Sequence, residues 1–238
     1  MRKAAVIAAA FLVSSCGAGQ QEAVVFAASS LNGVGEELEE AFELANPGTE
    51  ITMSYAGSAE LVRHLAAGAP ADVLITADEI SAEESGLDAR PVATGRLVLA
   101  LAQGNPAGLT DPRDVGSARL ALCAPEVPCG RLARQFLEGP AAGQELALEP
   151  SMESSVTDVA TKVTTGAVDA GFIYEANAKA LGLTYLPLDG VAANVYPAAL
   201  TSRGADNEAA QAFYHWLTGP EAQEIFNRHG FETVGGGE

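Results

Sequence analysis

The feature that most constrains the fold is the repeated alternation of short apolar runs with amphipathic segments. The run "AVVFAA", residues 23–28, predicts a buried strand. The helix predicted after it has one apolar face, formed by Val34, Leu38, Phe42 and Ala45. Strands and helices that alternate in this way indicate an α/β architecture with parallel sheets. With 238 residues the chain is long enough for one large domain or two small ones.

The charge balance limits the partners of the protein. The formal net charge is −18 at pH 7, so the surface repels nucleic acid and anionic membranes, and we expect no nucleic-acid partner. An anion would have to be held by neutral donors. The histidines His64, His215 and His229 show no ligand spacing, and we therefore expect no metal-ion ligands.

The N-terminus predicts a targeting segment over residues 1–15. A positively charged start precedes an apolar run that is too short to span a bilayer as a mature helix. The segment ends in "LVSSC", which resembles a bacterial lipoprotein cleavage motif with Cys16 as the lipidated residue. Plain secretion with an incidental cysteine is the alternative. Residues 16–22 are then a tether, and we expect membrane contact only through the lipid anchor, on the outer face of the cytoplasmic membrane.

Two further cysteines, Cys123 and Cys129, stand in "CAPEVPC". With Cys16 assigned to the lipid, two cysteines are left, and outside the cytoplasm an even number of cysteines favours a disulfide, here one that closes a small loop. Two free thiols are the alternative.

Four places along the chain share one pattern, in which a predicted strand ends in small or hydroxyl residues and a helix begins. They are "AASSLNG", "YAGSAEL", "PEVPCGRL" and "MESSVTD". Ligands of open α/β sheets bind outside the carboxyl ends of strands, and a helix N-terminus offers unpaired N–H groups to an anion. Four such ends that converge could saturate a small oxyanion with hydrogen bonds. The alternative for each is a serine that only caps its helix, or a glycine that only makes a turn.

Two other side chains need comment. Tyr174 lies near the end of the predicted strand "AVDAGFIYEA", where it is either a donor to a ligand or a packed aromatic with a wet hydroxyl. Arg131 follows the third strand end, and we expect an exposed helix arginine there rather than one that leans toward an anion.

The order of these motifs resembles that of the molybdate-binding proteins of ABC importers, from about residue 24 to residue 231. The most specific motif is "GAPADVLITAD", followed by the closing "GPEAQEIFNRHGF". The other segments that carry the resemblance are "VVFAASSLNGVGEELEEAFE", "YAGSAELVRHLAA", "PEVPCGRLA" and "AVDAGFIYEANA".

The resemblance implies a two-lobed periplasmic-binding-protein fold of type II, with the ligand in the cleft. Each lobe would be a mostly parallel sheet flanked by helices. Residues 23–99 plus 200–238 would form the first lobe and residues 100–199 the second. The chain would then cross between lobes near Leu99–Ala102 and Ala198–Thr201.

The resemblance also implies the binding residues. Ser30 and Ser58 would give hydroxyl and backbone donors, Cys129 and Val156 backbone N–H groups, and Tyr174 its phenol. The family often has alanine at the position of Cys129, so only the amide role carries over. Residues expected to support these are Ser29, Gly57, Gly130 and Ser155.

The function implied by the resemblance is capture of molybdate, and of tungstate, outside the cytoplasmic membrane and delivery to an ABC permease. The protein would act as a monomer without a cofactor. A receptor for another oxyanion such as sulfate is the alternative on the same scaffold. A hydrolase is disfavoured because the chain has neither a G-x-S-x-G elbow nor an S-x-x-K dyad.

Overall fold

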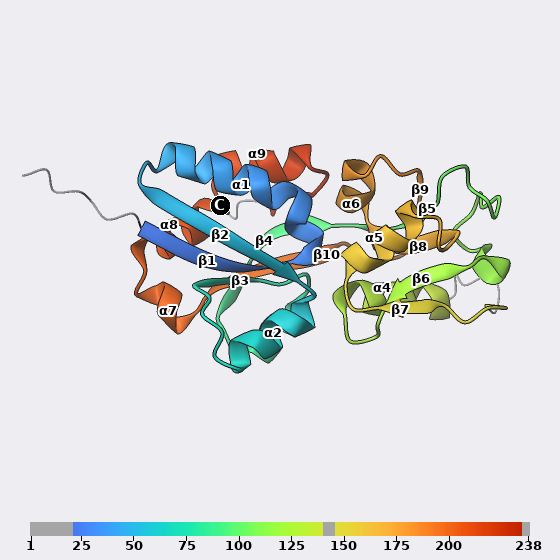
Figure 1. The fold of residues 1–238 in the computed structure, drawn as a ribbon, viewed down its shortest axis with the longest axis horizontal. Coiled ribbons are helices and arrows are strands. Elements are labelled where there is room, and N and C mark those ends of the chain that lie inside the picture. The colour runs from blue at the N-terminus through green and yellow to red at the C-terminus, as the bar shows by residue number, and fades with distance from the viewer. Residues whose placement is uncertain (1–20, 140–145, 235–238) are drawn as a thin grey trace, which may run out of the picture.

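The computed structural model describes residues 21–139 and 146–234 and contains two lobes, each built on a five-stranded sheet. The lobes lie side by side along the long axis (Figure 1). The predicted signal peptide and Cys16 lie outside the described residues. Among the described helices, none is long and apolar enough to cross a membrane.

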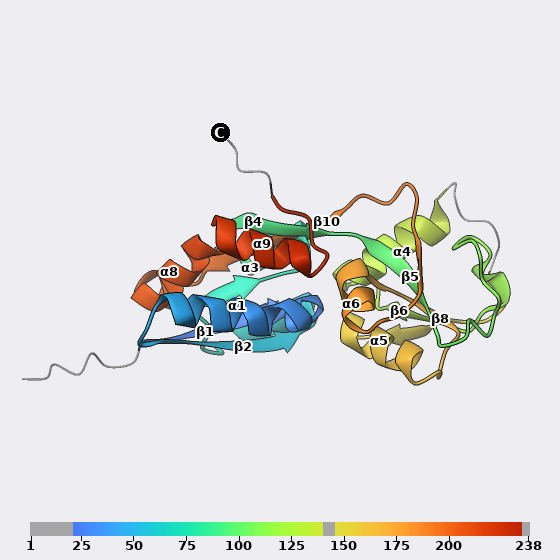
Figure 2. The ribbon, with the colours of Figure 1, turned by 90° about the horizontal axis from the view of Figure 1, so that it is seen from above.

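The sheet of the first lobe has the strand order β2-β1-β3-β10-β4. Its strands are β1 (Gln21–Ala28), β2 (Thr49–Ala56), β3 (Val73–Ile75), β4 (Ala89–Gly95) and β10 (Asn194–Leu200). The segments that flank it are the short 3-10 helix η1 (Ser29–Leu31) and the helices α1 (Asn32–Ala45), α2 (Ser58–Ala66), α3 (Glu79–Ser85), α7 (Ser202–Ala205), α8 (Glu208–Trp216) and α9 (Pro220–Arg228). Helices α1 and α9 lie side by side on this lobe (Figure 2). Strand β1 begins at Gln21, so its first two residues overlap the expected tether.

The sheet of the second lobe has the order β7-β6-β8-β5-β9. Its strands are β5 (Leu97–Leu101), β6 (Leu120–Cys123), β7 (Ser151–Glu153), β8 (Ala170–Tyr174) and β9 (Tyr185–Pro187). Its helical segments are η2 (Val115–Ser117), α4 (Pro128–Glu138), α5 (Val156–Thr164) and α6 (Glu175–Ala180). The predicted α/β class, with mostly parallel sheets in two lobes, is confirmed.

In each sheet one strand runs against the other four, β10 in the first and β5 in the second. These are also the strands that begin after the chain changes lobe. The chain crosses at Arg96, between β4 and β5, and returns through residues 188–193, between β9 and β10. The predicted crossings near Leu99–Ala102 and Ala198–Thr201 are therefore wrong, because these residues lie in or directly after strands paired within one sheet. An apolar run looks the same in either lobe, since its pairing partner is not visible in the sequence.

Each lobe has its own apolar core. In the first lobe Val34, Leu38 and Phe42 of α1 are buried as predicted, and Phe42 meets Phe213 of α8 edge-on with ring centroids 5.1 Å apart. Ala45 is exposed, contrary to the prediction, and is the last residue of α1. Two separate cores leave the loops at the strand ends free to face each other across the boundary between lobes.

Candidate functional site

The five predicted binding residues line one small cavity between the lobes. The residues that line it are Ala28, Ser29, Ser30, Gly57, Ser58, Ala77, Val127, Pro128, Cys129, Val156 and Tyr174. The first six come from the first lobe and the last five from the second. Two supporting residues, Gly130 and Ser155, are not part of this lining but directly adjoin the lining residues Cys129 and Val156 in the chain. The structure thus brings the predicted set together.

The first lobe contributes two buried hydroxyl groups. Ser30 lies in η1 directly after β1, and its Oγ atom makes no hydrogen bond of ordinary geometry with any described residue, although the Tyr196 hydroxyl lies close to it. Ser58 is the first residue of α2, and its Oγ atom accepts a hydrogen bond of 2.9 Å from the Ala77 amide. A hydroxyl that already accepts keeps its own proton for another partner. Both groups are therefore available to donate into the cavity.

The second lobe contributes amides from two helix N-termini. Helix α4 begins at Pro128, which has no N–H, and the amides of Gly130 and Arg131 both bond to the Val127 carbonyl. The Cys129 amide lies in the first turn, where no helical acceptor exists.

Helix α5 begins at Val156, whose amide is likewise a first-turn donor. Ser155 caps this helix, and its Oγ atom accepts from the Asp158 amide at 3.2 Å. The partial positive charge of both helix ends is directed to the same cavity.

A disulfide joins Cys123, at the end of β6, to Cys129 in the first turn of α4. The prediction of a closed loop is therefore confirmed, and the free-thiol alternative is excluded. A Cβ atom at Gly130 would lie 2.1 Å from the Ala124 carbonyl oxygen, so only glycine allows the helix to approach the loop this closely. Together the two features hold the Cys129 amide in place.

Tyr174 ends β8, is fully buried and is one of the residues that line the cavity. The hydroxyl oxygen accepts a hydrogen bond of 3.1 Å from Nδ2 of Asn194. Burial raises the pKa of the Tyr174 phenol well above its usual value, so the group stays protonated and can donate. Of the alternative, the packed ring is observed, since Tyr174 meets Tyr196 with ring centroids 5.7 Å apart, whereas the side chain is buried and not solvent-exposed.

Asn194 was not found by sequence reasoning. It begins β10, is buried, and also donates through Nδ2 to the Ala77 carbonyl. Its only signal in the sequence is a polar residue at the start of a strand, which is too common to be informative.

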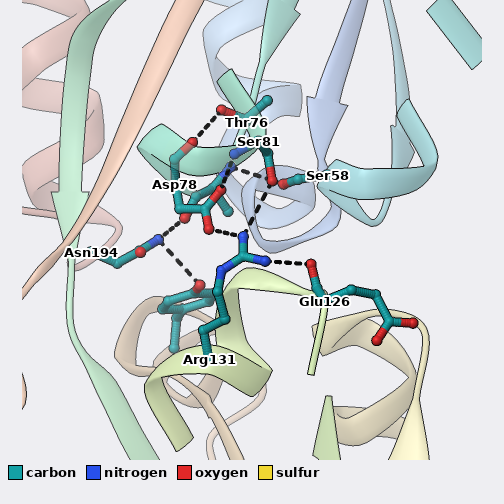
Figure 3. A network of polar contacts seen from close by, with 9 residues as sticks. Ser58, Thr76, Asp78, Ser81, Glu126, Arg131 and Asn194 are labelled. Carbon is teal, nitrogen blue, oxygen red and sulfur yellow. Dashed lines mark hydrogen bonds and ion pairs between the residues drawn. The ribbon is translucent and has the colours of Figure 1, made fainter. Parts of the chain in front are cut away.

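Arg131 does not lie on the surface as expected. Its Nη2 atom forms an ion pair with Oδ2 of Asp78 in the other lobe, and Nη1 donates to the Glu126 carbonyl at 2.5 Å (Figure 3). Asp78 also caps α3 by accepting from the Ser81 amide at 2.8 Å. Burial lowers the pKa of Arg131. Because Asp78 neutralises the guanidinium, Arg131 joins the lobes and adds no free cation to the cavity lining.

Further contacts join the lobes around the cavity. Thr157 Oγ1 donates to the Ser29 carbonyl at 3.4 Å, and Asn177 Nδ2 donates to the Ser30 carbonyl at 3.0 Å. A Cβ atom at Gly57 would lie 2.5 Å from the Ser154 carbonyl oxygen. The lobes are thus closed against each other, and Gly57 is required at this closest approach.

The chemistry of the cavity is that of hydrogen-bond donors. Its lining includes four hydroxyl-bearing residues and the first turns of two helices. Within residues 21–139 and 146–234 no group of three His, Cys, Asp or Glu side chains could hold a metal ion. Convergent neutral donors with two helix ends suit a small oxyanion without a cationic side chain.

Comparison with known proteins agrees with this geometry. The family model described as bacterial extracellular solute-binding protein matches residues 23–232. The molybdate-binding protein ModA of Mycobacterium tuberculosis is 35% identical over 90% of this chain and 85% of its own length, and that of Escherichia coli is 28% identical over 90% of each chain.

Among solved structures, the periplasmic molybdate-binding protein of Azotobacter vinelandii has a TM-score of 0.76 at 25% identity, covering 89% of this chain and 99% of its own. The resemblance to molybdate-binding proteins seen in the motifs is therefore confirmed. The chain belongs to the bacterial extracellular solute-binding protein family.

Proposed function

We propose that the protein captures molybdate outside the cytoplasm and delivers it to an ABC permease. The observation that carries this proposal is the convergence of Ser30, Ser58, Cys129, Val156 and Tyr174 on one cavity between the lobes. The three relatives named above, from Mycobacterium tuberculosis, Escherichia coli and Azotobacter vinelandii, are molybdate-binding proteins, which supports the identity of the anion. The role is one of binding and not of catalysis.

The donor-only cavity also accounts for selectivity. Tungstate is nearly the size of molybdate and is expected to bind as well, whereas the smaller sulfate would leave donors without a partner. A receptor for sulfate remains the second candidate on this scaffold. Competition calorimetry with molybdate, tungstate and sulfate separates the two, and preferred binding of sulfate would overturn the proposal.

Binding is coupled to closure of the lobes. Each lobe holds only part of the donor set, so a bridging anion stabilises the closed form in preference to an open one. The hinge would lie at Arg96 and residues 188–193, where the chain changes lobe. Small-angle scattering should show a more compact particle with molybdate than without it.

The role of the first-lobe serine is tested by Ser30→Ala. One lost donor to an anion costs about 1.5–3 kcal/mol, which weakens binding about 10- to 150-fold. Ser54→Ala is the control, because Ser54 is an exposed serine of β2 that is not part of the cavity lining. Equal affinities of the two variants by calorimetry would remove Ser30 from the site.

The location and state of the protein are proposed in the same way. We expect a monomer anchored through Cys16 on the outer face of the membrane. Metabolic labelling with a fatty acid should mark the wild-type protein and not Cys16→Ser. Native mass spectrometry of the purified protein should show one chain with one bound oxyanion.

A further inference from the structure

Asn194 occupies a special position, because its side-chain amide joins residues of both lobes. Its Nδ2 atom lies within hydrogen-bond distance of the Ala77 carbonyl oxygen in the first lobe and of the Tyr174 hydroxyl in the second. It begins β10 directly after the chain returns from the second lobe, and it is more than nine-tenths buried.

The chemistry of these partners fixes the direction of each hydrogen bond. A carbonyl oxygen can only accept, so the Asn194 atom that faces Ala77 must be the NH₂ nitrogen. The second hydrogen of this nitrogen is then available to Tyr174, whose oxygen acts as the acceptor. The Tyr174 proton must therefore point elsewhere, and Tyr174 is one of the residues that line the cavity.

The same arrangement extends to the first lobe through Ala77. Its carbonyl accepts from Asn194 while its amide donates to Ser58 Oγ at 2.9 Å. The Ser58 proton is thereby also released for the cavity. Two ligand hydroxyls, one in each lobe, are held as donors by a chain of hydrogen bonds that has Asn194 at its centre.

We propose that Asn194 is a positioning residue that determines specificity, because it makes the Tyr174 O–H bond point toward the cavity. The cavity then rejects oxyanions that carry a proton. This inference rests on the proposed function and names the feature that separates accepted from rejected anions. Molybdate near neutral pH is a fully deprotonated dianion and needs only donors. Hydrogen phosphate has the same charge and shape but carries one proton, which requires an acceptor.

The variant that tests the inference is Asn194→Asp. An ionised carboxylate has no hydrogen, and a protonated carboxyl group has one, which it donates to the Ala77 carbonyl. In neither form can residue 194 donate a hydrogen bond to Tyr174. Tyr174 must then donate to residue 194, which turns a lone pair of the phenol oxygen toward the cavity. Hydrogen phosphate gains an acceptor for its proton, while molybdate loses a donor.

The experiment compares molybdate and inorganic phosphate by competition calorimetry at about pH 8, where both are dianions. Any general effect of the new carboxylate acts on both and cancels in the ratio of affinities. We expect the phosphate-to-molybdate ratio to rise at least about tenfold in Asn194→Asp, equivalent to about 1.4 kcal/mol. Asn194→Leu, which has similar volume and no donor, should shift the ratio in the same direction by a smaller factor.

Two results would overturn the inference. One is a ratio unchanged in both variants, which reduces Asn194 to a structural residue. The other is the same shift in a Tyr174→Phe background, where no phenol proton remains to be redirected. Failure of the wild-type protein to bind molybdate would instead overturn the proposed function. Melting curves without ligand confirm that the variants fold.

Discussion

The ion pair between Arg131 and Asp78 leads to a prediction about the affinity for molybdate. The direction of the change shows whether the pair stabilises the closed form or acts only through its charges. Arg131 lies on α4 and Asp78 caps α3, so the pair holds the two lobes together beside the cavity. Asp78→Asn keeps the helix cap, since asparagine caps as well as aspartate, but it removes the charge that Arg131 meets. We predict weaker molybdate binding, because the closed form loses a contact that an open form does not have.

The size of the effect follows from the exposure of the pair. A hydrogen bond to a charged group contributes about 1.5–3 kcal/mol. The side chains are 27% exposed for Arg131 and 12% for Asp78, so solvent screening favours the lower end of this range. A loss of about 1.5 kcal/mol corresponds to about tenfold weaker binding.

The assay is calorimetric titration with molybdate at low salt. Asp111→Asn is the matched control, because this aspartate pairs with Arg113 within the second lobe and the change in net charge is the same. Its affinity should stay within about twofold of wild type. If Arg131 and Asp78 acted only through their charges, removing a negative charge near a dianion would tighten binding. Unchanged or tighter binding in Asp78→Asn would therefore refute the reasoning.

Three further predictions concern closure, the disulfide and pH. Gly57→Ala should weaken molybdate binding by about tenfold or more in calorimetry, because its Cβ would meet the Ser154 carbonyl at 2.5 Å in the closed form; unchanged affinity would contradict this. Replacing Cys123 and Cys129 together by serine should lower the free energy of unfolding by about 2 kcal/mol in urea titration, and wild-type stability would contradict it. Burial raises the pKa of the Tyr196 phenol, so the unfolded chain loses this proton first, and the stabilisation present below about pH 10 is lost as pH rises. The melting temperature should fall above about pH 10, and less steeply in Tyr196→Phe; equal slopes would contradict the assignment.

Local sequence patterns predicted much of the fold and the cavity, for an identifiable reason. Strand ends followed by helix starts are short-range features, and Ser30, Ser58 and Val156 each lie at such a junction. Parallel strands bring their carboxyl ends to one edge, so the junctions of each lobe converge without knowledge of long-range contacts. The disulfide between cysteines six residues apart is local in the same sense.

The features that were missed all depend on contacts between distant segments. Arg131 and Asp78 are 53 residues apart, and nothing near either residue indicates its partner. Asn194 acquires its role because β10 inserts against the direction of its neighbours in the first sheet. The wrong crossing points have the same origin, since the strand that holds Leu99 is assigned to a lobe by pairing with β8 and β9.

The central claim is that neutral donors from both lobes enclose a dianion with no cationic side chain among its direct contacts. A crystal structure with molybdate tests this most directly. We predict that the anion oxygens lie within hydrogen-bond distance of the Ser30, Ser58 and Tyr174 hydroxyls and of the Cys129 and Val156 amides, while the Arg131 side chain stays paired with Asp78. Molybdate bound elsewhere, or bound chiefly by the guanidinium of Arg131, would contradict the account.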